Sequence, residues 1–314
     1  MNEAKLRSLS AVLCAGWKKK PGKVLEAVLA VYSRRPAGKG PEFVDDGYVM
    51  SLAGDSGALR FFYGLDCRLG LLRPSAALGR VKRRLETFSS LCLSLNRGYG
   101  LAFDAGLAGG LAERLLRGGL LPGWPFFGAK LKPDGGLVLT VYFIDPPWEA
   151  GLGWSNMKQL LGTVGLKPAG VGELRLPGAF DCAGLSLSSD GGRSLKIYTR
   201  FPSPAAAGGA AALRKLHGAA GADFLKRCAE AAERRPVRHW TNAYGFEPGS
   251  ARPVSVKTEM HFRSPVPAAE AMRLLGIGAG SAEAAQWALP LDNGCAVTTL
   301  AAQKSLRTLY FTAY

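Results

Sequence analysis

The sequence predicts an α+β fold in which two-stranded antiparallel hairpins alternate with helical segments. Five stretches show the two-residue alternation of strands on either side of a turn-forming sequence. The stretches between them are rich in Ala, Leu, Arg, Lys and Glu at helical spacing. The chain has 314 residues, 47% of them hydrophobic, which is enough for a sizeable core.

The expected hairpins have turns in which glycine and aspartate are frequent. Four of the turns read GDSG, PDGG, SDGG and EPGSARP, and Gly and Asp tolerate the positive φ of tight hairpin turns. The expected strands lie near residues 43–53 and 58–67, 125–132 and 137–144, 182–188 and 194–201, 239–246 and 253–262, and 294–300 and 305–313.

The expected helices lie between these hairpins, near residues 3–35, 74–93, 103–117, 153–164, 204–218, 220–234, 266–275 and 280–288. The pattern indicates a structural unit of two helices and one hairpin, ααββ, used about five times along the chain. We therefore expect residues 1–314 to form a single domain with ten antiparallel strands.

The two faces of the expected strands indicate how the sheet is arranged. One face of segment 254–262 is mostly apolar, and the other carries Ser255, Lys257, Glu259 and His261. Helices must cover the apolar face, so the polar face lines the interior if ten strands close into a barrel, which also removes the sheet edges. The alternative is an open sheet with helices on one side and the polar face in bulk water.

Composition excludes several classes of protein. The sequence contains no run of about 18 apolar residues, so no transmembrane helix is expected. At the N-terminus an acidic residue comes early and lysines follow the apolar patch, which is the wrong order for a signal peptide. We therefore expect a cytoplasmic protein. Six scattered cysteines and three histidines indicate neither a disulfide framework nor a histidine-rich metal site. The net charge of +16 fits an anionic partner or simply an arginine-rich surface, but no nucleic-acid-binding motif appears.

Closure into a barrel would bring cations from several hairpins together. The basic residues expected on the inner face are Arg60, Lys196, Arg200, Lys257 and Arg307, and the aromatic residues near them include Phe62, Tyr142, Tyr198 and Tyr310. Cations that share such an interior repel one another unless an anion lies among them, and a diphosphate accepts many charge-assisted hydrogen bonds. Tyrosine π-faces stabilise a carbocation. The combination favours ionisation of an allylic diphosphate and capture of the allyl cation by a nucleophile.

Three stretches of the sequence resemble the ABBA-type aromatic prenyltransferases, and within them most closely the cyanobactin-type peptide prenyltransferases. They are FFGAKLKPDGGLVLTVYFIDPPWEA, CAGLSLSSDGGRSLKIYTRF and WTNAYGFEPGSARPVSVKTEMHF, and the final SLRTLYFTAY is also similar. The resemblance implies a ten-stranded barrel ringed by helices, called a PT barrel, that binds dimethylallyl or a longer prenyl diphosphate as co-substrate.

The resemblance also implies the acceptor and the cofactor requirement. The expected acceptor is a side chain of a linear or cyclic, ribosomally made peptide, and the alternative is a small indole or phenol. No metal is required, because the pair Asp45–Asp46 is isolated and no DDxxD motif appears, so magnesium is not indicated. We expect a monomer without nucleic-acid or membrane partners. Two competing hypotheses are a basic nucleic-acid-binding protein and a catalytically inactive barrel that binds a small anion.

Individual residues take roles from this resemblance. Arg60 matches the family's first-repeat arginine, and Lys196 with Tyr198 matches its Lys-x-Tyr pattern; Lys257 and Arg307 match later basic positions. Asp46 lies where the family carries its catalytic carboxylate, with Glu42 and Asp45 as near alternatives, and the family usually has glutamate there. Val138 replaces an expected basic residue, for which Arg200 compensates.

The remaining candidates come from the strand pattern. Glu259 is a second candidate base or a structural partner of Lys257 or His261. The side chains expected to shield the cation are Tyr142, Tyr198, Tyr310, Phe62 and Trp240, although strand-favouring packing is the alternative for the tyrosines and core packing for Trp240.

Overall fold

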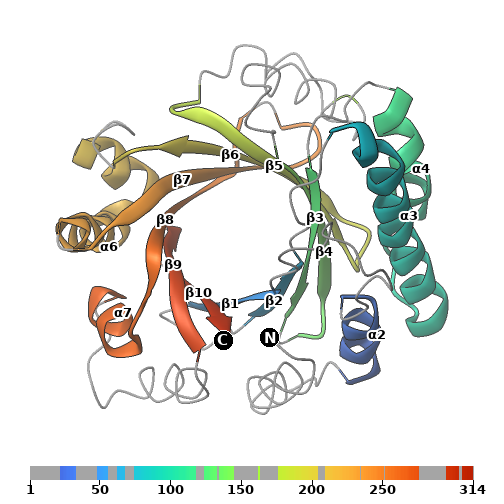
Figure 1. Cartoon of the computed structure of the whole chain (residues 1–314), viewed down its shortest axis with the longest axis horizontal. Helices are drawn as coiled ribbons and strands as arrows, with labels where there is room; N and C mark the ends of the chain where they lie inside the picture. The colour runs from blue at the N-terminus through green and yellow to red at the C-terminus, as the bar shows by residue number, and fades with distance from the viewer. Residues whose placement is uncertain are drawn as a thin grey trace.

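The computed structural model describes residues 22–32, 48–55, 62–67, 74–117, 124–132, 134–144, 162, 176–203, 209–233, 235–250, 252–275, 295–303 and 306–313. Figure 1 shows these residues as a ring of strands with helices on its outer side. The predicted helices near 153–164 and 280–288 lie outside the described residues, except for Gly162.

The strands form one closed barrel in which neighbours along the chain are neighbours in the sheet. They are β1 (Tyr48–Asp55), β2 (Phe62–Cys67), β3 (Trp124–Leu131), β4 (Leu137–Ile144), β5 (Ala179–Ser188), β6 (Arg193–Phe201), β7 (Val237–Phe246), β8 (Ser255–Val266), β9 (Cys295–Gln303) and β10 (Leu306–Ala313). Every neighbouring pair is antiparallel, and β1 pairs with β10 to close the sheet. The alternative of an open sheet is therefore wrong.

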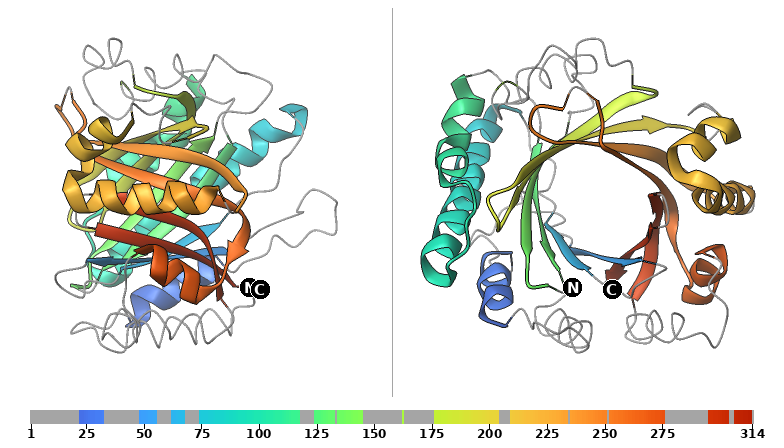
Figure 2. Two further views of the ribbon diagram at one scale, coloured as in Figure 1. Left: turned by 90° about the vertical axis from the view of Figure 1, so that its left-hand side faces the viewer. Right: turned by 180° about the vertical axis from the view of Figure 1, so that it is seen from behind.

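The helices cover the outside of the barrel (Figure 2). They are α2 (Gly22–Tyr32), α3 (Pro74–Tyr99), α4 (Ala105–Arg117), α6 (Gly209–Ala232) and α7 (Ala268–Leu275). The predicted mixture of helices with a curled antiparallel sheet is confirmed. Within the described part of the chain, no helix is long and apolar enough to cross a membrane.

Two hairpin turns have the chemistry that their sequences predict. In the β3–β4 turn, Gly135 has a φ of 85° and the Asp134 carboxylate accepts a hydrogen bond from the Gly136 amide at 2.8 Å. In the β5–β6 turn, Gly191 has a φ of 88° and Asp190 accepts from the Gly192 amide at 3.0 Å. These turns fix the strand register, and a shift of one residue would exchange the two faces of each strand.

The hydrophobic core lies between the sheet and the helices. Leu139 on β4 and Ile197 on β6 are fully buried there, together with Phe88 of α3 and Phe224 of α6. Their strand neighbours alternate toward the barrel interior, which is lined by polar and small side chains. The polar face is therefore the inner face, as expected.

A buried polar network connects α6 to the outer face of β7 and β8. The Nε2 atom of His217 lies 2.8 Å from the Thr258 hydroxyl, which donates to the Asn242 side-chain oxygen at 2.7 Å. Asn242 in turn donates to the Tyr244 hydroxyl at 3.0 Å. Thr258 thus accepts from Nε2–H, and among the described residues the buried Nδ1 of His217 has no hydrogen-bond partner. Burial lowers the pKa of His217 to about 4, so this side chain is neutral in the folded protein.

Acid should weaken the fold through His217. Between pH 6.5 and about 4 the unfolded chain binds a proton at this residue and the folded chain does not, so stability falls as the pH falls. The contribution amounts to about 3 kcal/mol over this window. Urea unfolding at pH 7 and at pH 4 should show a larger loss for the natural chain than for His217→Gln. Equal losses in the two proteins would contradict the assignment.

Candidate active site

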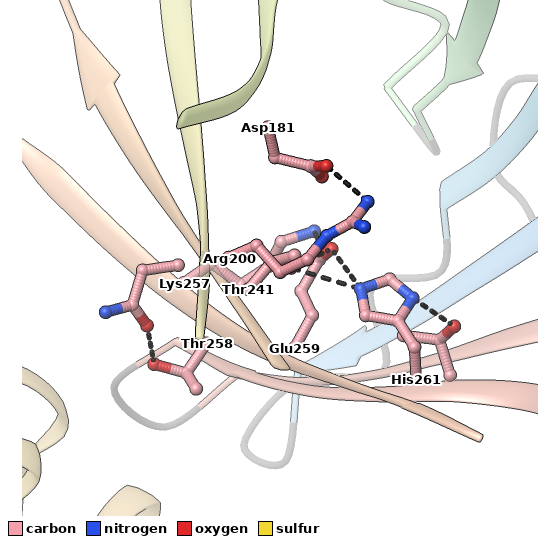
Figure 3. Close-up of polar contacts among 9 residues, drawn as sticks. Asp181, Arg200, Thr241, Lys257, Thr258, Glu259 and His261 are labelled. Atoms are coloured by element: carbon pink, nitrogen blue, oxygen red, sulfur yellow. Dashed lines mark hydrogen bonds and ion pairs between the residues drawn. The ribbon is translucent and has the colours of Figure 1, made fainter. Parts of the chain in front are cut away.

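The interior of the barrel gathers the charged residues of β6 and β8. On β6, Lys196 and Arg200 are in phase, with Tyr198 between them; on β8, Lys257 and Glu259 are in phase with His261. Strand β7 lies between β6 and β8, and its Ala243 pairs in register with both Tyr198 and Lys257. Figure 3 shows the contacts that Arg200, Glu259 and His261 make here.

Three lysines meet in this interior and are called here the lysine cluster: Lys130, Lys196 and Lys257. Lys130 contacts Lys196 and lowers its pKa, burial lowers it further, and Lys257 adds to the shift. The pKa of Lys196 therefore lies well below its usual 10.5. An enclosed set of like charges of this kind favours an anion with several oxygen atoms.

Lys130 is the member of the cluster that sequence reasoning missed. It pairs in register with Val138 on β4, the position at which a basic residue is expected from the sequence. The first strand of the hairpin thus supplies the cation that the second strand lacks. The sequence does contain a signal for Lys130, because Phe126, Gly128 and Lys130 alternate on the first strand of this hairpin. The predicted ring of cations is built only from the second strand of each hairpin and therefore omits it.

Anion binding should change the protonation of the lysine cluster. A bound diphosphate favours the charged form of Lys196 and raises its pKa toward the usual value. Binding then takes up a proton in the pH range between the pKa of the free and the bound state, and donor affinity falls as the pH rises through that range. Titration calorimetry with dimethylallyl diphosphate at a series of pH values below 10.5, each in two buffers of different ionisation enthalpy, measures the uptake. Lys196→Met should abolish it; the same uptake in both proteins would contradict this role.

Glu259 is buried and held by three neighbours. It forms an ion pair with Lys257, accepts a hydrogen bond from the Thr241 hydroxyl at 3.2 Å, and lies 3.5 Å from Nε2 of His261. Burial raises the pKa of this carboxyl, but Lys257 and the hydrogen bond from His261 outweigh it and hold the pKa well below 4.5. Glu259 is therefore an ionised counter-charge to Lys257, and such a carboxylate is a weak base.

Two histidines extend this group toward one end of the strands. The rings of His239 and His261 stack with their centroids 4.4 Å apart, and Nδ1 of His261 lies 3.1 Å from the Thr299 hydroxyl. Burial and then the nearby His261 and Arg200 lower the pKa of His239 to about 3. His239 is thus a neutral ring at neutral pH.

Two tyrosines lie beside the lysine cluster. The rings of Tyr142 and Tyr198 are 6.1 Å apart at 60°, an edge-to-face arrangement, and both side chains are buried. They share a small interior cluster with Cys182 and Ala243. Their placement beside cations, in phase with Lys196, is the one expected for aromatic walls of a cation-stabilising pocket.

Gly184 determines where the Tyr142 ring lies. It pairs in register with Tyr142 on one side and with Lys196 on the other. A Cβ atom at this position would lie 2.9 Å from Cδ1 and 3.0 Å from Cε1 of Tyr142. The absence of a side chain lets the ring lie over the β5 backbone.

Gly184→Ala should push the Tyr142 ring toward the barrel axis and narrow the space beside Lys196. For the prenyl donors that the sequence resemblance implies, we expect the rate with geranyl diphosphate to fall about tenfold more than the rate with dimethylallyl diphosphate, a cost of about 1.4 kcal/mol. The ratio of kcat/KM for the two donors measures this effect. The control is Gly109→Ala on α4, where an added Cβ meets nothing within 4 Å. An unchanged ratio in Gly184→Ala would contradict the positioning role.

Asp181 enters the site through an irregularity in β5. The β5–β6 register shifts between Phe180 and Cys182, so Asp181 is the extra residue of a β-bulge. Its carboxylate forms an ion pair with Arg200, whose side chain is 49% exposed. Arg200 is therefore paired with an acid, whereas the lysines that lower the pKa of Lys196 are Lys130 and Lys257.

Two other predicted positions fall in the helix-facing register of the sheet. Trp240 is 2% exposed and packs in the helix-facing core with Phe246, in phase with Tyr244, so the prediction that it shields the cation is wrong. Position 307 pairs with Ala302, which belongs to the same helix-facing core. By backbone register, position 307 thus belongs with the helix-facing positions, whereas Arg307 is expected on the inner face from the sequence.

The remaining predicted residues are placed by backbone register or lie outside the described residues. Position 310 pairs with Thr299, whose hydroxyl contacts His261 inside the barrel. Position 62 pairs with Ala53, and Ala53 pairs with position 308, two residues from position 310. By register, positions 62 and 310 therefore belong to the inner face of the sheet. Asp46 and Arg60 lie outside the described residues. Among the described residues, no group of three or more His, Cys, Asp or Glu side chains is arranged to hold a metal ion.

Several solved structures have a similar fold. The chain is similar to 5-dimethylallyltryptophan synthase from Streptomyces coelicolor, with 18% identity, a TM-score of 0.70 and coverage of 99% of this chain and 96% of that one. It is also similar to the prenyltransferase PriB in its complex with L-tryptophan and dimethylallyl thiolodiphosphate, with 16% identity, a TM-score of 0.67 and coverage of 99% of this chain and 96% of that one. A third similar structure is AnaPT from Neosartorya fischeri, with 13% identity, a TM-score of 0.59 and coverage of 92% of this chain and 85% of that one. No family model and no curated protein matches the chain. At these identities the likeness establishes a shared fold.

Proposed function

We propose that the protein is a single-domain, metal-independent ABBA-type prenyltransferase that transfers a dimethylallyl or longer prenyl group from an allylic diphosphate to an aromatic acceptor. The observation that carries the proposal is the lysine cluster, enclosed in the barrel beside Tyr142 and Tyr198. The fold supports it, because similar structures are named for dimethylallyl transfer to tryptophan.

The proposed mechanism assigns one task to each group of residues. The lysine cluster binds the diphosphate and stabilises the charge that grows on it as the carbon–oxygen bond breaks. Tyr142 and Tyr198 face the allyl cation and exclude water. A carbon of the acceptor ring then bonds to the cation, and the ring loses a proton to a base, for which Asp46 remains the proposed residue. Glu259 keeps Lys257 in place.

The acceptor is proposed to be a small aromatic molecule such as tryptophan. The structural neighbours in complex with tryptophan favour it. A peptide side chain, as in the cyanobactin-type enzymes, is the second candidate, favoured by the resemblance of the strand 194–201 and its SDGG turn to that type.

Transfer assays with a mass readout test the function. The chain is incubated with dimethylallyl or geranyl diphosphate, with EDTA, and with indoles, phenols, L-tryptophan or peptides. A gain of one prenyl mass on an acceptor is expected. No gain with any donor, together with salt-sensitive retention of DNA or RNA, would favour the nucleic-acid-binding hypothesis and contradict the proposal.

A further inference from the structure

The Asp181–Arg200 ion pair forms a second charged group in the barrel, distinct from the lysine cluster. In the cluster three lysines lie together, and the carboxylate of Glu259 pairs with one of them, Lys257. The second group combines one acid and one base, and it lies beside Glu259 and His261 (Figure 3). Its side chains are accessible, at 49% for Arg200 and 18% for Asp181.

The charge balance of this pair selects a different ligand from that of the lysine cluster. A diphosphate is attracted by a group in which cations outnumber carboxylates, whereas the carboxylate of Asp181 repels it and neutralises Arg200. A ligand that carries both an ammonium and a carboxylate satisfies the two side chains together, because each gains an opposite charge. The bulge has a clear consequence here, since regular alternation would turn residue 181 away from the face that carries Cys182.

The spacing along β6 fits such a ligand next to the prenyl donor. Lys196, Tyr198 and Arg200 follow one another on the interior face, at about 7 Å per pair of residues and about 13 Å in total. An acceptor whose charged end lies at Arg200 extends its aromatic side chain toward Tyr198. Its ring then lies between the charged end and the diphosphate held near Lys196.

We propose that Asp181 and Arg200 bind the ammonium and the carboxylate of a free α-amino acid acceptor. Asp181 and Arg200 thus select a free aromatic amino acid over an internal residue of a peptide, whose amine and carboxyl are both blocked. This inference rests on the proposed function.

A series of acceptors that differ only in their charged groups tests the proposal. L-tryptophan carries both charges, tryptamine the ammonium, indole-3-propionate the carboxylate, and N-acetyl-tryptophan amide neither; the corresponding tyrosine set covers phenols. We expect kcat/KM to be at least tenfold higher for a free amino acid than for its capped form, and intermediate for the singly charged compounds. A capped form that reacts as well as the free amino acid would overturn the inference and leave the proposed function standing.

Variants assign the two charges separately. In Asp181→Asn, kcat/KM should no longer be higher for compounds with an ammonium than for compounds without one. In Arg200→Met, the same should hold for compounds with a carboxylate. Asp181→Glu should keep the preference for compounds with an ammonium. Donor affinity should stay within twofold in all three. The control is Asp190→Asn at the opposite end of the same hairpin, where the amide oxygen still accepts from Gly192. If Arg200→Met loses donor affinity without a change in acceptor preference, Arg200 binds the diphosphate, and the inference is overturned. No transfer from any donor to any acceptor overturns the proposed function itself, and this inference with it.

Discussion

Replacing Lys196 by alanine is expected to lower kcat/KM for the prenyl donor about 100-fold and to weaken donor binding by a similar factor. Lys130 and Lys257 both lower the pKa of Lys196, so an anion bound at its ammonium also lies near the other two lysines. A charge-assisted hydrogen bond to a diphosphate is worth about 2–3 kcal/mol, and 100-fold corresponds to about 2.7 kcal/mol.

The same replacement should make the empty protein more stable. Below the pH range in which Lys196 of the empty protein loses its proton, the replacement relieves repulsion with Lys130 and Lys257 and removes a buried charge, so the melting temperature should rise while activity is lost. This opposite movement separates a binding role from simple damage to the fold. The matched control is Lys226→Ala on α6, where the lysine is exposed and lies 4.0 Å from Glu230. Equal donor affinity in Lys196→Ala and Lys226→Ala would exclude Lys196 from the binding site.

The strand pattern predicted much of the candidate site because alternation is a local property. Segment 194–201 places Lys196, Tyr198 and Arg200 on one face whatever the rest of the chain does, and segment 254–262 does the same for Lys257 and Glu259. The polarity of these faces then determined which of them points inward, since helices need an apolar surface to cover.

The errors arise where the placement of a residue depends on another strand. Asp181 reaches the site through a bulge, which alternation cannot reveal. Arg307 and Tyr310 are three residues apart, so a regular strand cannot place both on one face, and pairing with β9 assigns the interior row to position 310. For Trp240, however, the signal was present: Tyr244 and Phe246 are in phase with it and mark the apolar face.

Glu259→Gln should cost about 3–5 kcal/mol of folding stability, because it leaves Lys257 buried without its counter-charge beside the other two lysines. The double variant Glu259→Gln/Lys257→Met removes both charges and should recover most of that loss. Urea unfolding of both variants and of Lys257→Met alone completes a double-mutant cycle. The control is Glu270→Gln, which breaks the more exposed pair with Arg235, 2.6 Å apart, and should cost about 1 kcal/mol or less.

Pyrophosphate distinguishes a structural ion pair from one that prepares an anion site. If Glu259 neutralises part of the lysine cluster when no donor is bound, an added anion can take its place, and pyrophosphate should stabilise Glu259→Gln more than it stabilises the natural chain. The reason is that Lys257 lacks its counter-charge in the variant, so its ammonium can bind the added anion. A smaller stabilisation of the variant, or a double variant as unstable as Glu259→Gln, would show that the carboxylate does not act by balancing Lys257. Glu259 would then have to be considered again as a participant in proton transfer.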